Sequence, residues 1–348
     1  MWLLREIKHR QFELWLLKCM QAMDDPVGMQ AAIVQRLFHR LLNELSRVLA
    51  LLEPFRAELA GVVVESTFNW YWLVDGLQAA GYPVVLANTA ALPQYAGLKY
   101  GDDDSDARHL AHLLRLGLIR RGYICPPQWR AVRDLARKRG QLVRNRTLHI
   151  LSVEGSVARH TGTRISGNAV KQLDARAVAQ WGWSADSTLA VQVNVSALHH
   201  LDTLIQRVER RLRERVRLRA EYAVLKSAPG IGEVLATTIM LELGTIERFA
   251  RVGDFASYAR CVDSVRLSNG KKKGEGNRKN GNRYLAWAFV EAAHFARRYN
   301  AAAKRFYERK KAKANVAVAT KALAHKLARA CYYMLKEQKP FDERRCFG

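Results

Sequence analysis

The chain has 348 residues, of which 57 are Lys or Arg and 32 are Asp or Glu, so its formal net charge is +25. Hydrophobic residues make up 49% of it, enough to bury a sizeable core, and this excludes a wholly disordered polycation. Such an excess of positive charge repels itself unless an anion neutralises it, and the usual partners are nucleic acid or an acidic membrane face. The length predicts two or three domains.

The five cysteines stand singly, and no two of them have the Cys-x-x-Cys spacing of a zinc ligand pair. An odd number of isolated thiols fits a reducing compartment better than a secreted disulfide scaffold. Charges interrupt every apolar run before the roughly 20 residues that a membrane helix needs, and the first residues are amphipathic rather than signal-like. The sequence therefore predicts a cytoplasmic protein with no membrane partner.

In chain order, residues 1–50 are predicted to form one or two amphipathic helices, broken near Pro26. Short β-branched runs follow at 61–65 and 83–88, with a helix between them and another helix after Asp103. Strand–helix–strand alternation predicts a parallel sheet, which binds ligands at the carboxyl ends of its strands.

From Gln128 to Tyr222 apolar residues recur at helical spacing in two long segments, with Trp181 and Trp183 in a connection between them. This pattern predicts a coiled-coil hairpin or dimerisation arm. The last third is predicted to be helix, loop and helix, with a Gly-, Asn- and Lys-rich loop over 268–282. Residues 266–345 contain 22 Lys or Arg and 6 Asp or Glu, so the strongest contact with a polyanion is expected there.

One candidate site is acidic. Glu65 closes the first strand, and Asp103 and Asp106 lie one helical turn apart at the start of a helix. Three carboxylates could converge on Mg²⁺, which prefers oxygen ligands. The alternative is that the aspartates only cap the helix, whose amino-terminal end favours negative charge.

A second candidate is the turn that contains Gly230 and Gly232, which is similar to a helix-hairpin-helix turn. Glycine allows the backbone to approach a phosphate closely, and the helix that follows offers free N–H groups. An ordinary helix–helix turn also favours glycine and proline, so this pattern leaves both interpretations open.

A third candidate is the basic loop that begins at Ser268. A serine among cations can act as a nucleophile towards a phosphodiester, although a solvated loop that only grips a DNA backbone has the same composition. Five aromatic residues follow at spacings more typical of a helical core than of a base-stacking surface. They are Trp287, Phe289, Phe295, Tyr299 and Tyr307.

Several blocks of sequence together carry a resemblance to a known family. They include GVVVESTFNWYWLVDGL, LKYGDDDSDARHLAHLLRLG, SAPGIGEVLATTIMLELG and KALAHKLARACYY. Over about residues 40–348 they resemble transposases of the insertion sequence 110 family, and within it subgroup 1111. The resemblance implies an α/β, RuvC-like (RNase H-like) domain with a DEDD carboxylate set, a helical coiled-coil linker, and a mostly helical carboxyl-terminal transposase domain.

The resemblance also implies a mechanism, in which DNA is cut and rejoined through a serine–phosphate link. Ser268 is the expected nucleophile, with Ser264 a weaker candidate, while Glu65, Asp103 and Asp106 hold Mg²⁺. The expected partners are double-stranded DNA at the element ends and target, a structured guide RNA, and further copies of the chain in a dimer or tetramer associated with the nucleoid. The residues expected to bind DNA are Gly230, Gly232, Lys271, Lys272, Lys273, Arg278 and Lys279.

One departure from the family concerns its first Asp, which belongs on an opening strand in a Gly-Ile-Asp-like segment. Nothing in residues 1–39 matches that segment, so the alternative function is an impaired remnant that only binds DNA or RNA. A nuclease that uses the carboxylates alone is a third possibility. The domains expected are an atypical helical segment (1–39), an incomplete RuvC-like domain (40–125), the linker (126–220) and the transposase domain (221–348).

Overall fold

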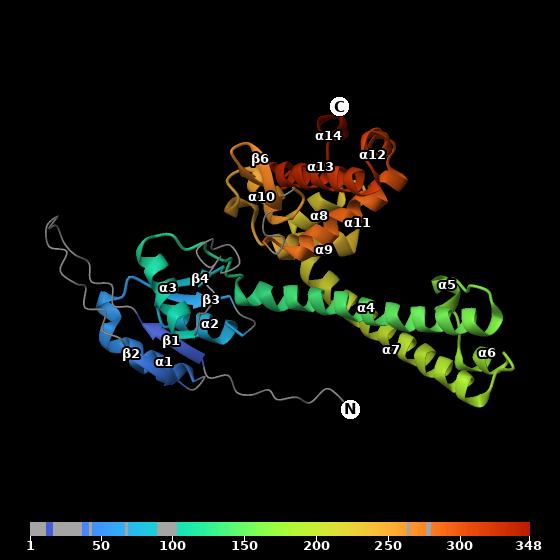
Figure 1. The fold of residues 1–348 in the computed structure, drawn as a ribbon, viewed down its shortest axis with the longest axis horizontal. Helices are drawn as coiled ribbons and strands as arrows, with labels where there is room; N and C mark the ends of the chain where they lie inside the picture. The colour runs from blue at the N-terminus through green and yellow to red at the C-terminus, as the bar shows by residue number, and fades with distance from the viewer. Residues whose placement is uncertain are drawn as a thin grey trace. The chain divides into compact units, whose positions relative to one another are not determined.

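The computed structural model describes residues 12–16, 37–41, 44–66, 69–88, 103–262, 265–275 and 280–348 (Figure 1). The chain divides into two compact units, Met1–Cys125 and Pro126–Gly348. Helices dominate the described residues, and the strands form three separate pairs. None of the described helices combines the length and the apolarity that crossing a membrane requires.

The predicted strand–helix–strand unit is present in the first unit. Strands β3 (Val62–Glu65) and β4 (Val84–Ala87) pair in parallel, and α2 (Tyr71–Ala79) connects them. The alternate residues Val62 and Val64 are buried because successive side chains of a strand point to opposite faces. These valines form a core with one face of α2, so the local pattern of apolar residues is sufficient to explain the unit.

The other described helices of this unit pack around the cores of the strand–helix–strand unit. They are α1 (Leu45–Leu52), the 3₁₀ helix η1 (Glu53–Glu58) and α3 (Asp103–Arg115). The Leu45 side chain approaches Gly76 of α2 so closely that a Cβ there would lie 2.3 Å from it. Leu110 and Leu113 of α3 pack with Ala87 of β4, so α3 is attached to the strand pair through its second half.

The prediction of helices before residue 45 is wrong at two places. Strands β1 (Phe12–Leu16) and β2 (Leu37–Leu41) form an antiparallel pair with Phe12 opposite Leu41. Five-residue segments that mix apolar and charged residues, as these do, fit a helical and an alternating period about equally well. Pairing with a strand far away in the sequence decides between a helix and a strand. Local spacing of apolar residues does not reveal that pairing partner.

The two long helices predicted between Gln128 and Tyr222 are present as α4 (Pro127–Thr161) and α7 (Ala185–Val216), which lie side by side (Figure 1). The short helices α5 (Gly167–Val170) and α6 (Ala175–Ala179) lie in their connection. An apolar seam joins the two long helices near that end, and ion pairs Arg139–Glu209 and Arg146–Asp202 continue the contact. We refer to this pair of helices as the arm.

The rest of the second unit is a helical bundle that shares one core with the opposite end of the arm. Its helices are α8 (Ala220–Lys226), α9 (Glu233–Leu243), η4 (Ile246–Arg248), α10 (Val252–Tyr258), α11 (Arg283–Tyr299), α12 (Ala301–Lys313), α13 (Val316–Glu337) and α14 (Glu343–Phe347). Strands β5 (Val265–Ser268) and β6 (Lys271–Glu275) lie between α10 and α11. Helix α11 is buried along a row of alanines, whose small side chains allow its neighbours to approach closely.

Four cysteines of the described chain are buried thiols, so we expect them to resist alkylation in the folded protein. Burial raises the pKa of Cys261 to about 12 and that of Cys346 to about 11. Because the thiolate is the reactive form, Cys261 should react with iodoacetamide at pH 8 on the order of 1,000-fold more slowly than an exposed cysteine. Peptide mapping after a timed reaction, with and without guanidinium, measures this rate. Fast labelling of Cys261 without denaturant would contradict its buried position.

Candidate functional site

The acidic candidates all belong to the first unit. Glu65 is the last residue of β3 and is exposed, and Asp103 and Asp106 lie in the first turn of α3. The side chains of the two aspartates are not among those that the structure describes. Among the side chains that it does describe, no three His, Cys, Asp or Glu gather around a metal-sized site. The structure therefore places Glu65 at the end of a strand and Asp103 and Asp106 at the start of a helix.

The two glycines of the helix–helix turn have different environments. Gly230 has φ +80°, and a Cβ there would lie 2.2 Å from the carbonyl oxygen of Ala292 and 2.6 Å from the nitrogen of Ala296. Gly232 precedes α9, and a Cβ there would meet nothing within 4 Å. Close packing of the turn against α11 is sufficient to explain Gly230, whereas nothing in the packing requires Gly232 to be glycine.

This contrast predicts opposite outcomes for two matched substitutions. Gly230→Ala should lower the free energy of unfolding by about 3 kcal/mol, because it adds both a steric overlap and an unfavourable backbone conformation. Gly232→Ala should change it by less than about 1 kcal/mol. Urea unfolding of both variants measures the difference. Equal stability of the two variants would show that the approach to α11 is not as close as described.

The basic stretch after Val265 forms a β-hairpin, where a loop was predicted. Strands β5 and β6 are antiparallel, with Ser268 opposite Lys271. The two residues between them, Asn269 and Gly270, have φ +50° and +71°, as the tight turn of a two-residue hairpin requires. Asn-Gly is the strongest short signal for such a hairpin, and the signal was present in the sequence.

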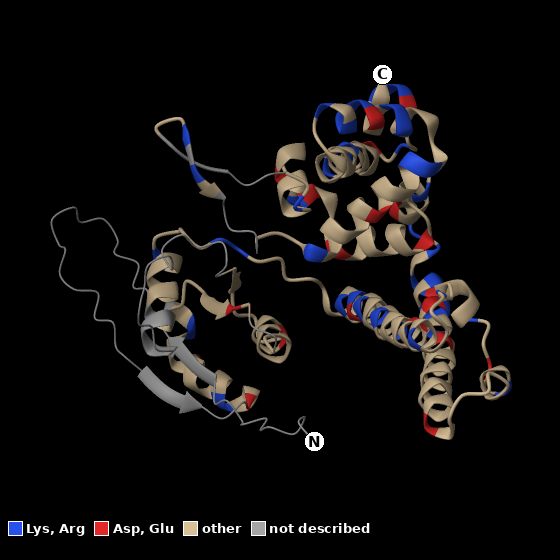
Figure 2. Ribbon diagram, turned by 45° about the vertical axis from the view of Figure 1, so that its right-hand side comes forward, with Lys and Arg blue, Asp and Glu red and all other residues tan. Residues whose placement is uncertain are grey.

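The hairpin carries lysines on one strand and the candidate serine on the other (Figure 2). Lys271 and Lys273 are exposed, and Lys272 lies between them on β6. The structure does not describe the side chain of Ser268. Ser264, Arg278 and Lys279 lie outside the described residues. The backbone thus places the candidate nucleophile next to the turn of a hairpin rich in positive charge.

The hairpin belongs to the segment between Arg260 and Asn282, and the two ends of this segment lie together on the bundle. The Arg260 guanidinium donates to the carbonyl of Gly281 at 2.9 Å, and the backbone N–H of Asn282 donates to the carbonyl of Tyr258 at 2.6 Å. Gly281 has φ +83°, and a Cβ there would lie 2.6 Å from the Tyr258 oxygen. These contacts hold the two ends of the segment together at the surface of the bundle.

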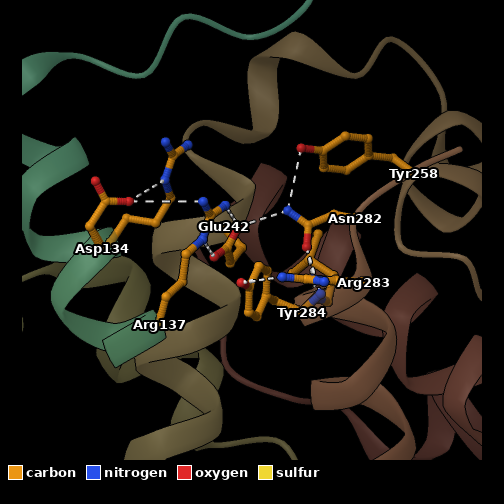
Figure 3. A network of polar contacts seen from close by, with 9 residues as sticks. Asp134, Arg137, Glu242, Tyr258, Asn282, Arg283 and Tyr284 are labelled. Atoms are coloured by element: carbon orange, nitrogen blue, oxygen red, sulfur yellow. Dashed lines mark hydrogen bonds and ion pairs between the residues drawn. The ribbon is translucent and has the colours of Figure 1, made fainter. Parts of the chain in front are cut away.

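A buried carboxylate secures this point (Figure 3). Glu242 of α9 is 4% exposed and accepts hydrogen bonds from Arg137 Nε at 2.6 Å and Arg137 Nη2 at 2.8 Å. The Asn282 side-chain amide also donates to it at 2.8 Å. The Asn282 side-chain oxygen accepts the N–H groups of Tyr284 and Leu285 at the start of α11. One network therefore joins the arm, α9 and the exit of the hairpin segment.

Electrostatics favour the charged form of Arg137. Burial opposes a charge on Arg137, but the hydrogen bonds and the negative charge of Glu242 outweigh it, so the pKa of Arg137 is raised. The guanidinium also lies over the Tyr284 ring, 4.6 Å from its centroid. Neither Glu242 nor Arg137 was singled out from the sequence. The sequence did contain a signal for Glu242, which is a single carboxylate within the apolar run of α9. Acidic side chains are seldom buried without a partner.

The aromatic residues after the hairpin divide into two groups. Phe289 and Tyr307 are in the core, as predicted. The prediction is wrong for Trp287, Phe295 and Tyr299, which are 43%, 45% and 72% exposed. Only the position of each ring on its helix, relative to the neighbouring helices, separates the two groups.

Two family models match separate parts of the chain. A DEDD transposase model of the IS110 type matches residues 30–160, and the model described as "Transposase IS116/IS110/IS902 family" matches residues 222–308. Together they cover more than half of the chain and include the strand–helix–strand unit, α3, the turn at Gly230, the hairpin and Asn282. No curated protein matches the chain. The chain belongs to the IS110 family and is a DNA transposase.

Proposed function

We propose that this transposase cuts and rejoins double-stranded DNA through a covalent bond between Ser268 and a phosphate of the DNA. The observation that carries the proposal is the position of Ser268 at the end of β5, directly opposite Lys271 in a hairpin that lies between Arg260 and Gly281, which are hydrogen-bonded to each other. Positive charge beside the serine attracts the phosphodiester and stabilises negative charge that develops on its oxygens.

In the first step the Ser268 Oγ forms a bond to phosphorus while the bond to one deoxyribose oxygen breaks. The serine proton passes to that leaving oxygen, which becomes a hydroxyl group. In the second step a hydroxyl of another strand attacks the same phosphorus, and the serine is released with its proton. The number of phosphodiester bonds is unchanged, so no external energy source is needed.

The carboxylates of Glu65, Asp103 and Asp106 are proposed to hold Mg²⁺. All three side chains offer oxygen, the donor that Mg²⁺ prefers, so the donor set fits this ion. When bound, the ion would stabilise negative charge on phosphate oxygens. We further propose that residues 40–125 supply this site, that 126–220 form a linker and dimerisation arm, and that 221–348 supply the nucleophile. A structured RNA is proposed to guide the choice of target.

The test is a search for the covalent intermediate. Purified protein is incubated with Mg²⁺, the RNA transcribed from the flank of its element and end-labelled DNA of the element junction, and the products are separated on a denaturing gel. A labelled band at the mass of protein plus DNA supports the proposal, as does its loss when Glu65 is replaced by Gln. DNA cleavage without any adduct would instead favour a nuclease that uses the carboxylates alone.

One observation favours a second candidate, a protein that binds nucleic acid without cutting it. Neither of the strands β1 and β2 contains an aspartate, whereas the family resemblance implies an Asp on an opening strand. Tight, salt-sensitive DNA binding with no adduct and no cleavage under Mg²⁺ or Mn²⁺ would favour this candidate.

A further inference from the structure

An exposed surface at the end of α11 and the start of α12 combines aromatic rings with positive charge. Phe295 and Tyr299 lie one turn apart on α11 and are 45% and 72% exposed. Their ring planes are nearly parallel, inclined by 12°, with centroids 6.5 Å apart. Large apolar side chains are seldom this exposed in one place without a partner. We call this region the α11–α12 surface.

Cations surround the two rings. The Arg298 guanidinium lies 5.4 Å from the Tyr299 ring centroid, and a groove of about 600 Å³ beside Phe295 is lined by Arg297, Arg298 and Lys304 among others. Residues 294–313 contain eight Lys or Arg and a single acid, Glu308. That acid forms an ion pair with Lys311 at 3.6 Å and also lines the groove, and the net charge of the segment 294–313 is strongly positive.

This combination favours a nucleic acid strand over a protein partner. Eight cations in twenty residues match a phosphate backbone, and each exposed ring can stack on a base. In a duplex the bases are already stacked on both faces, so rings of this kind contribute only where bases are unpaired. Resting on the proposed function, in which one strand is cut and its phosphate is then joined to another strand, we propose that the α11–α12 surface binds an unpaired DNA strand by stacking its bases on Phe295 and Tyr299.

Fluorescence anisotropy of the full-length protein tests this proposal with three labelled probes at one salt concentration: a 20-nucleotide oligo-dT, a 20-base-pair duplex and a 20-nucleotide oligo-U. The double substitution Phe295→Ala/Tyr299→Ala should weaken binding of oligo-dT about tenfold or more and leave duplex binding within about twofold. Arg298→Gln/Lys304→Gln should weaken binding of both DNA probes, because phosphate contacts do not depend on base pairing.

Retained duplex binding shows that the alanine variant is folded, and two further variants serve as controls. Leu218→Ala removes another exposed apolar side chain, 89% exposed, and should leave all three affinities unchanged. Phe295→Trp/Tyr299→Trp keeps the rings and should retain oligo-dT binding. Unchanged oligo-dT binding in the alanine variant would overturn the proposal, as would a loss confined to oligo-U. The assay needs no strand cleavage, so its result is independent of whether Ser268 forms an adduct.

Discussion

Ser268→Ala is expected to abolish the covalent protein–DNA adduct and the recombination of element DNA while leaving DNA affinity almost unchanged. Removal of the hydroxyl takes away the atom that attacks phosphorus, and loss of a nucleophile typically lowers the rate by a factor on the order of 10⁴ or more. The lysines of β6 remain on the hairpin, so the attraction of phosphate persists. Adduct formation is measured on a denaturing gel, and recombination by the yield of circular element DNA in cells.

Ser264→Ala is the matched control, because this serine belongs to the same segment and was the weaker candidate. It should retain the adduct. If Ser264→Ala removes the adduct and Ser268→Ala does not, the nucleophile has been assigned to the wrong serine. If both variants retain it, the serine mechanism is wrong. Anisotropy with duplex DNA shows in each case that the variant still folds and binds.

Glu242→Gln is expected to cause a large loss of stability in the second unit. The Glu242 side chain is 3% exposed and that of Arg137 is 31% exposed, so neutralising the carboxylate removes the closer counter-ion of a partly buried guanidinium and leaves Asp134, which is 3.9 Å away and 41% exposed. Breaking one side of a buried ion pair lowers the free energy of unfolding by about 3 kcal/mol, near the lower limit of the usual range. For a unit of this size the melting temperature should fall by roughly 6–12 °C.

Glu214→Gln is the control for this prediction, since Glu214 pairs with Arg211 in an exposed ion pair whose side chains are 51% and 60% exposed. That pair should contribute less than about 0.5 kcal/mol. The double variant Arg137→Met/Glu242→Leu removes both charges and should regain much of the stability. Calorimetry of the three variants measures their stability. A loss of stability in Glu242→Gln no larger than that in Glu214→Gln would contradict the buried network.

The residues of this network share no pattern along the sequence. Arg137 and Glu242 are 105 residues apart, and Asn282 lies 40 residues beyond Glu242. No local spacing relates these three positions, because each side chain belongs to a helix or helix end with its own apolar face. The hairpin is a different case. The Asn269-Gly270 signal was local and sufficient, but the density of lysines around it favoured the interpretation as a solvated loop.

The parts of this protein that depend on spacing along the chain could be predicted without a structure. They are the parallel strand pair with its connecting helix and the two long helices of the arm, and long blocks of matching residues indicated the family. Three other features could not be predicted: the pairing of Phe12–Leu16 with Leu37–Leu41, the contact of Gly230 with α11, and the exposure of Phe295 and Tyr299. Periodicity specifies only which face of an element is apolar. Which distant element covers that face, or leaves it exposed, depends on how the whole core packs.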